Sequence, residues 1–317
     1  MTPPLILLGV SRSGTTLLRV VLDRSPGIAI PDESFFVPLL ARRHGRTIDA
    51  QQFLDDVARI PTVRDWGVSV ADVASRIRPG MPTRKAIAAI YEAYAAGAGK
   101  ERWGDKTPMY MRHLSLLEDL FPGAQYVHLV RDGRDAALSF LQMPEGTFTR
   151  TWAHPTTTAQ FACLWRKEVR DARALGRRVG AARYLEVRYE DLVGDPETTV
   201  RAICGFAALP YDAAMLDYSG AVDVSSKPHQ QRLLSPPTTG VRSWRAEMAA
   251  EEVAAFDAVA GDLLADLGYE VSSDAAPGVT VRLQRRWYDI RLAAWNAAAS
   301  AVQRSPLWRR RHPRLSA

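Results

Sequence analysis

One short loop, residues 9–16 (GVSRSGTT), constrains the fold more than any other part of the chain. It follows an apolar run over residues 4–10 that is typical of a buried parallel strand. It leads into residues 14–24, where leucines and valines recur at helical spacing. A glycine-bearing loop between a strand and a helix can turn its backbone amides toward an anion at the helix N-terminus. The sequence therefore predicts a strand–loop–helix unit that binds a phosphate-bearing nucleotide.

The loop departs from the common nucleotide-triphosphatase pattern G-x4-G-K-[ST]. Gly9 and Gly14 match that pattern, but Thr15 occupies the position of the lysine that normally reaches the β- and γ-phosphates. This argues against an ATP-driven kinase. Arg12 instead brings a planar guanidinium into the loop, which suits phosphate or sulfate oxygens. The alternative is a plain strand–turn–helix with two chance glycines. The candidate nucleotide-binding residues are Arg12, Ser13, Gly14, Thr15 and Thr16.

Strands and helices alternate along most of the chain. Apolar runs predict further strands at 102–105, 125–130 and 183–189. Helical periodicity and capping signals predict helices near 35–43, 49–58, 83–96, 109–120, 131–140, 158–176, 196–206 and 249–267, with a turn at Pro61. Such alternation favours right-handed crossovers and a parallel sheet. We expect an α/β fold of the P-loop type, with three layers and helices on both faces of the sheet. Ligands of such sheets bind beyond the carboxyl ends of the strands.

Charge is distributed unevenly along the chain. The formal net charge is +6, yet residues 279–317 contain nine arginines and one acidic residue. The first 278 residues are therefore nearly neutral, and an anionic ligand must be bound by local arginines rather than by a global field. We expect one domain over residues 1–270 with helical acceptor-side insertions, and a basic helical tail over residues 271–317.

The cysteine content and the hydropathy of the chain bear on the cellular compartment expected for the protein. Cys163 and Cys204 lie in apolar helical contexts, where buried free thiols are more typical than a disulfide. No apolar stretch approaches the roughly 18 residues of a membrane-spanning helix. We expect a soluble, cytoplasmic protein. The histidines show no metal-ligand spacing, so no metal is expected, and nucleic-acid binding is not expected either.

A second motif occupies residues 130–139 (VRDGRDAALS), where a predicted strand becomes a helix. Arg131 leaves the strand tip toward the expected ligand side. Ser139 follows eight residues later, about two helical turns on. The alternative is an ordinary charged helix start, with Asp132 and Asp135 favouring the helix dipole.

Together the two motifs resemble sulfotransferases that use 3′-phosphoadenylyl sulfate (PAPS), in particular the bacterial, tyrosylprotein-sulfotransferase-like branch. Residues 11–18 (SRSGTTLL) are similar to the family's 5′-phosphosulfate loop P-R-S-G-T-T-L-L, with serine in place of proline. Residues 131–139 are similar to its 3′-phosphate motif R-D-x-R-D-x-x-x-S. The resemblance implies that Arg131 and Ser139 bind the 3′-phosphate and that PAP is the product. We expect Arg134 and Asp135 to be structural and to form an ion pair.

The resemblance also implies the remaining site residues. Glu33, after the first helix, is the implied catalytic base, with Asp32 as its competitor and a surface acidic turn as the alternative. Arg12 and Lys106 are the implied catalytic cations, although pairing of Lys106 with Asp105 is an alternative. Nucleotide contacts are implied for Tyr189 in the segment RYEDL and for Arg242 in the late loop TGVRSWR, with Lys227 as a weaker candidate.

The expected reaction is in-line transfer of a sulfuryl group from PAPS to a hydroxyl of a small-molecule, carbohydrate, lipid or peptide acceptor. A nucleotide or small-molecule kinase and a noncatalytic nucleotide-binding relative are the alternatives. The tail over residues 279–304 has the pattern of an amphipathic helix, with Trp287 and Trp295 among its apolar residues. It predicts either peripheral contact with an anionic membrane or a helix packed on the body.

Overall fold

A computed structural model of the chain describes residues 2–143, 154–217, 243–272 and 278–304. Its centre is a five-stranded sheet in the order β2-β3-β1-β4-β5, in which all pairs are parallel. The strands are β1 (Leu5–Leu8), β2 (Ile28–Ala29), β3 (Arg102–Asp105), β4 (Gln125–Val130) and β5 (Tyr184–Arg188). The predicted α/β class and parallel sheet are confirmed.

Alternation along β1 divides the core between the two faces of the sheet. Leu5 and Leu7 belong to one buried cluster, and Ile6 and Leu8 to another, because successive strand residues point to opposite faces. The first cluster includes apolar residues of α1 (Thr15–Asp23), α10 (Tyr189–Gly194), α11 (Pro196–Ala207) and η2 (Ala213–Leu216). The second includes those of α6 (Thr83–Gly97), α7 (Leu114–Leu120), α8 (Gly133–Leu141), α9 (Thr158–Val179) and α13 (Ala250–Asp266). The fold therefore has the three expected layers.

The strand order places a topological switch beside β1. The chain passes from β1 toward the β3–β2 side of the sheet and later returns to β4 on the other side of β1. The loops that follow β1 and β4 thus leave the same edge of the sheet as neighbours, which is where open α/β sheets bind ligands. This topology brings residues 9–14 and residues 131–132 together.

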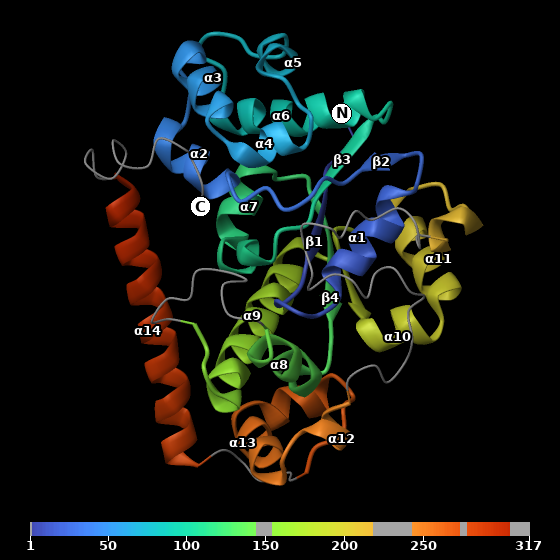
Figure 1. Ribbon diagram of the computed structural model, residues 1–317, viewed down its shortest axis with the longest axis vertical. Helices are drawn as coiled ribbons and strands as arrows, with labels where there is room; N and C mark the ends of the chain where they lie inside the picture. Colours follow the sequence, from blue (N-terminus) through green and yellow to red (C-terminus); the bar gives the residue numbers. More distant parts are fainter. Residues whose placement is uncertain (1, 144–153, 218–242, 273–277, 305–317) are drawn as a thin grey trace.

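Short helices gather at one end of the molecule (Figure 1). They are α2 (Val37–His44), α3 (Ala50–Ala58), α4 (Pro61–Asp65) and α5 (Val70–Ala74). Pro61, predicted as a turn, instead begins α4, because its fixed φ suits the first helical position. The single helix predicted over 109–120 is divided into η1 (Pro108–Arg112) and α7 at His113, whose φ of −130° is not helical.

The basic tail forms α14 (Val279–Arg304), with the bounds predicted from the sequence. Its Tyr288 and Leu292 are buried and belong to the core cluster that includes α9 and α13. Figure 1 shows α14 along one side of the molecule. Cys163 and Cys204 are buried free thiols, as expected. No helix among the described residues is long and apolar enough to cross a membrane.

Gly133 tests how tightly α8 packs, and Gly205 of α11 provides a control. A Cβ at Gly133, the first residue of α8, would lie 2.4 Å from the Phe256 ring and 2.7 Å from the Trp165 ring. We expect Gly133→Ala to lower the free energy of unfolding by about 1–3 kcal/mol through overpacking. Gly205 in α11 has open space at its Cβ position. Gly205→Ala should therefore raise the free energy of unfolding by about 0.5–1 kcal/mol.

Urea denaturation of the two alanine variants and the wild type measures both effects. Equal stabilities for the two variants would contradict the packing of α8 against α9 and α13.

Candidate active site

The loop after β1 is built to approach a ligand closely. Arg12 and Gly14 both have left-handed backbone conformations, with φ of 73° and 88°. Such a φ is uncommon at a non-glycine residue and marks a conformation held by its surroundings. At Gly14 a Cβ would lie 2.4 Å from the Tyr189 ring, so only glycine fits there. The hydroxyl of Ser13 is buried and has no hydrogen-bond partner among the described residues. The loop therefore holds a buried polar group whose natural partner is a ligand.

The two motifs found in the sequence meet at this loop. Arg12 Nε donates to Ser139 Oγ at 3.0 Å, across 127 positions of the chain. Arg131 Nη1 donates to the carbonyl oxygen of Arg12 at 3.2 Å. The Arg131 guanidinium also lies 4.6 Å from the centre of the Tyr189 ring. Arg12, Arg131, Ser139 and Tyr189, predicted separately, thus form one cationic cluster at the carboxyl ends of β1 and β4.

Tyr189 is held in place by the residue that follows it. Glu190 accepts a hydrogen bond from the backbone amide of Asp132 at 3.0 Å and from the Tyr269 hydroxyl at 2.8 Å. These bonds tie the end of β5 to the end of β4 and to the segment after α13. Glu190 therefore positions the segment that carries Tyr189, the residue predicted to contact the nucleotide. Sequence reasoning missed this structural role of Glu190.

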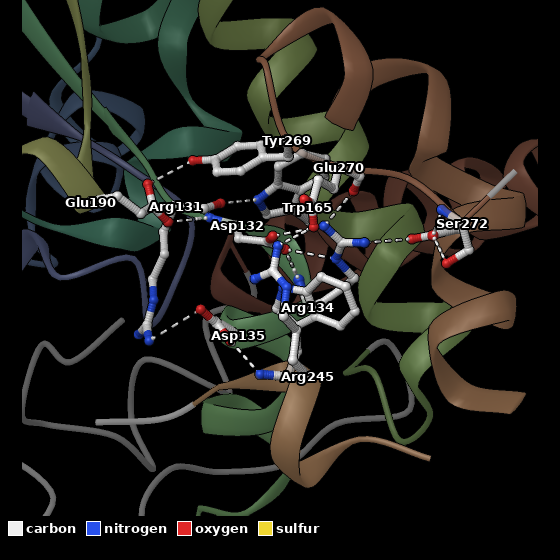
Figure 2. Close-up of polar contacts among 12 residues, drawn as sticks. Arg131, Asp132, Arg134, Asp135, Trp165, Glu190, Arg245, Tyr269, Glu270 and Ser272 are labelled. Atoms are coloured by element: carbon white, nitrogen blue, oxygen red, sulfur yellow. Dashed lines mark hydrogen bonds and ion pairs between the residues drawn. The ribbon is translucent and has the colours of Figure 1, made fainter. Parts of the chain in front are cut away.

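Arg134 is a buried structural cation, as expected from the sequence, but its partner is not Asp135. Its guanidinium bonds Asp132 at 3.0 and 2.8 Å and Asp257 at 3.3 Å, and stacks 3.7 Å from the Trp244 ring centre. Figure 2 shows Arg134 beside Asp132, while the Arg131 side chain extends away from it toward Asp135. A buried charge persists only with such compensation.

Asp135 connects the cluster to the start of α12 (Trp244–Glu247). It accepts a hydrogen bond from the backbone amide of Trp244 at 2.8 Å and lies 3.9 Å from Arg131. Burial raises the pKa of Asp135 to about 6. The contact fixes the chain just after the late loop. Arg242 and Lys227, predicted in that loop, lie outside the described residues.

The predicted base Glu33 and the predicted catalytic cation Lys106 meet on the other side of the loop. Lys106 Nζ donates to Glu33 Oε1 at 2.5 Å and to Thr16 Oγ1 at 3.2 Å. The Lys106 side chain is 1% exposed and that of Glu33 is 28% exposed. Burial lowers the pKa of Lys106, and the Glu33 carboxylate partly opposes this shift. Thr16 lies in the first turn of α1, so this pair stands directly beside the phosphate loop.

The two neighbouring acids have other partners. Asp32 pairs with Arg19 at 3.1 Å, and its side chain is 45% exposed. Asp105 accepts hydrogen bonds from Ser34 Oγ at 2.7 Å and from the Tyr91 hydroxyl at 2.8 Å. Lys106 is therefore hydrogen-bonded to Glu33 and not to Asp105, the alternative partner.

A buried polar network lies directly behind Glu33 and Lys106. Ser34 follows Glu33 and bonds the Tyr110 hydroxyl at 2.6 Å, while its amide donates to Thr107 Oγ1 at 3.0 Å. Thr107 in turn follows Lys106. The network thus joins the neighbours of the two candidate catalytic residues. Sequence reasoning missed it, although the adjacency of Ser34 to Glu33 and of Thr107 to Lys106 was an available signal.

Asp105 makes the stability of the folded protein depend on pH. Burial raises its pKa from the ordinary 3.8 to about 6. Between these values the unfolded chain releases the proton while the folded chain retains it, so rising pH removes stability. We expect the wild type to lose stability relative to Asp105→Asn as the pH rises from about 4 to about 6, with no further change above that.

Urea unfolding of wild type and Asp105→Asn at pH 4, 5, 6 and 7 measures this difference. Asp119→Asn, which removes an exposed carboxylate of α7, controls for loss of charge. A constant difference between wild type and Asp105→Asn across these pH values would refute the assignment.

A separate pocket lies away from the predicted site residues. A cavity of about 170 Å³ lies between α9 and α13, lined by Arg166, Arg170, Arg173, Arg177, Asp262, Leu263 and Asp266. None of the predicted site residues lines it. The described residues contain no group of three or more His, Cys, Asp or Glu side chains that could hold a metal ion.

Comparison with known proteins identifies the family. A family model described as the sulfotransferase family matches residues 3–213, which include Arg12, Lys106, Ser139 and Tyr189. The chain belongs to the sulfotransferase family. Nodulation protein NoeE of Sinorhizobium fredii is 31% identical over 91% of this chain and 74% of its own length. Protein-tyrosine sulfotransferase A of Caenorhabditis elegans is 25% identical over 86% of this chain and 69% of its own length.

Solved structures agree with this sulfotransferase fold. The sulfotransferase domain from the curacin biosynthetic pathway superposes with a TM-score of 0.55 over 86% of this chain and 99% of that domain, at 19% identity. The sulfotransferase domain from the Synechococcus PCC 7002 olefin synthase gives a TM-score of 0.51 over 90% of this chain and 94% of that domain, at 25% identity. The P-loop-type fold expected from the sequence is thereby confirmed. The membership in the sulfotransferase family confirms the expected sulfuryl-transfer activity.

Proposed function

We propose that this sulfotransferase uses PAPS as its donor and a hydroxyl group as its acceptor. The observation that carries the proposal is the 3.0 Å bond between Arg12 and Ser139. It joins the loop suited to a 5′-phosphosulfate to the helix suited to a 3′-phosphate, so one nucleotide with phosphates at both positions can be bound by both motifs. The missing P-loop lysine at Thr15 disfavours the kinase alternative.

The described residues fit such a donor. Ser13 Oγ and Arg131 Nε are buried without hydrogen-bond partners among the described residues, and both belong to the cluster of cations and donors around the loop. We assign Arg12, Ser13, Gly14, Thr15 and Thr16 to the 5′ end of the nucleotide. Arg131 and Ser139 would bind the 3′-phosphate, Tyr189 would contact the nucleotide, and Arg242 would close the site from the late loop.

Glu33 is our candidate for the base, and Asp32 is less favoured. Glu33 pairs with Lys106 beside Thr16, whereas Asp32 is engaged by Arg19. In the proposed reaction the acceptor oxygen forms a bond to sulfur as its proton passes to Glu33. The bond from sulfur to the bridging oxygen breaks, and PAP leaves with that oxygen. Arg12 and Lys106 would offset the negative charge on the sulfuryl and bridging oxygens.

The acceptor class is proposed only as a hydroxyl of a small molecule, carbohydrate, lipid or peptide. The names of several relatives specify protein tyrosine as their acceptor, which makes tyrosine peptides a natural first group to screen. A screen of labelled PAPS against peptides, phenols, sugars and lipids would identify the acceptor.

Donor binding provides a direct test that needs no acceptor. Isothermal titration in EDTA should show PAP binding at least about tenfold tighter than ADP, because only PAP offers a 3′-phosphate for charge-assisted hydrogen bonds. Ser139→Ala should weaken binding of PAP more than binding of ADP. Preference for ATP with magnesium over PAP would refute the proposed donor.

Glu33→Gln tests the base independently of the donor. It should leave PAP affinity nearly unchanged and slow transfer roughly 100- to 10,000-fold, the usual contribution of a general base. Asp32→Asn is the matched control and should retain most of the activity. Glu33 would not be the base if Glu33→Gln transferred sulfate at the wild-type rate. The same conclusion would follow if Asp32→Asn, and not Glu33→Gln, lost the transfer activity.

A further inference from the structure

The outer face of α14 is unusually apolar for an exposed surface. Val279, Leu283, Trp287 and Ile290 have exposed fractions of 67%, 62%, 66% and 52%. Among the described residues, Val70 is the only other large hydrophobic side chain in this exposed class, at 37%. Single exposed hydrophobic residues are common, but a contiguous set of them marks an interaction site.

These four residues form one stripe because of their spacing. They follow one another at intervals of four, four and three residues, which places them along one side of an α-helix. Tyr288 and Leu292, by contrast, are 3% and 2% exposed on the side that packs into the core. The helix therefore has two apolar sides, and packing against the body accounts for only one of them.

Positive charge borders the outer stripe. Arg282 and Arg286 are exposed and lie beside it on the helix surface. The sequence from residue 279 onward contains nine arginines and only Asp289 as an acid. Two copies of α14 packed stripe to stripe would bring these arginines together, so like-charge repulsion disfavours a second copy as the partner. A partner that is apolar inside and anionic at its surface could contact both the apolar stripe and its basic border.

We propose that α14 binds an anionic lipid bilayer, lying in the plane of the membrane interface. Leu283, Trp287 and Ile290 enter the region between headgroups and acyl chains, and Arg282 and Arg286 contact the anionic headgroups. An exposed tryptophan suits this boundary because its ring is apolar and its N–H is polar. The inner side of α14 stays packed on the body, so the whole enzyme is held at the membrane surface. This inference does not depend on the donor, the base or the acceptor.

Vesicle co-sedimentation of the full chain tests the proposal. We expect binding to phosphatidylcholine vesicles that contain phosphatidylserine, and much weaker binding to phosphatidylcholine alone. Leu283→Gln/Trp287→Gln keeps the charge and removes apolar area, and should weaken binding at least about tenfold. Gln284→Ala, an exposed polar substitution on the same helix that keeps every residue of the stripe, should bind as the wild type does.

A charge-matched pair tests the basic border. Arg282→Gln/Arg286→Gln should also weaken binding at least about tenfold. Arg177→Gln/Arg178→Gln removes the same charge from exposed positions in the last turn of α9 and should have little effect. All these positions are exposed, so circular dichroism, the melting temperature and PAP affinity should match the wild type. Those readouts separate loss of membrane binding from misfolding.

Three results would overturn the proposal. The first is absence of wild-type binding to anionic vesicles. The second is equal loss of binding in the α9 and α14 arginine pairs, which would indicate diffuse electrostatics. The third is a dimer detected by light scattering that dissociates in Leu283→Gln/Trp287→Gln, with no vesicle binding, which would make a second copy the partner of α14.

Discussion

The contact between Arg12 and Ser139 connects the parts of the molecule on which the site depends. It is possible only because β1 and β4 are parallel neighbours whose following loops leave the same edge of the sheet. Arg131, at the end of β4, donates to the backbone of Arg12 and so stabilises a left-handed conformation that would be costly alone. Two segments 127 positions apart thus form one cationic cluster, and neither forms it without the other.

A second set of interactions fixes the other half of the site. Lys106 follows β3, and Glu33 lies shortly after β2, so the parallel pairing of β2 with β3 brings ammonium and carboxylate together. The buried hydrogen bonds of Asp105 and Ser34 then hold the backbone on both sides of the pair. Buried polar groups are costly unless satisfied, and a satisfied network permits few alternative arrangements. This arrangement sets the position of Glu33 relative to Thr16 and the phosphate loop.

Structural and functional charges are separated within one motif. Residues 131–135 contain two arginines and two aspartates, yet they have different environments. Arg134 is fully buried between Asp132 and Asp257 and anchors α8 to α13, whereas Arg131 faces the loop. The tail shows a similar division on a larger scale, because one side of α14 packs on the core and the other presents apolar and basic groups outward.

The sequence by itself determined the local elements and their chemistry. Strands 102–105 and 125–130 and the helix over 279–304 follow from short-range patterns of hydrophobicity and charge. The same kind of pattern, with glycine and Arg12, predicts that the loop after β1 binds an anion. Only the tertiary structure decided which charges are partners: Arg134 with Asp257 rather than Asp135, Lys106 with Glu33 rather than Asp105, and Asp105 with Ser34 and Tyr91. The physical reason is that charge pairing depends on distance and burial, which are set by strand order and helix packing between residues far apart in the chain.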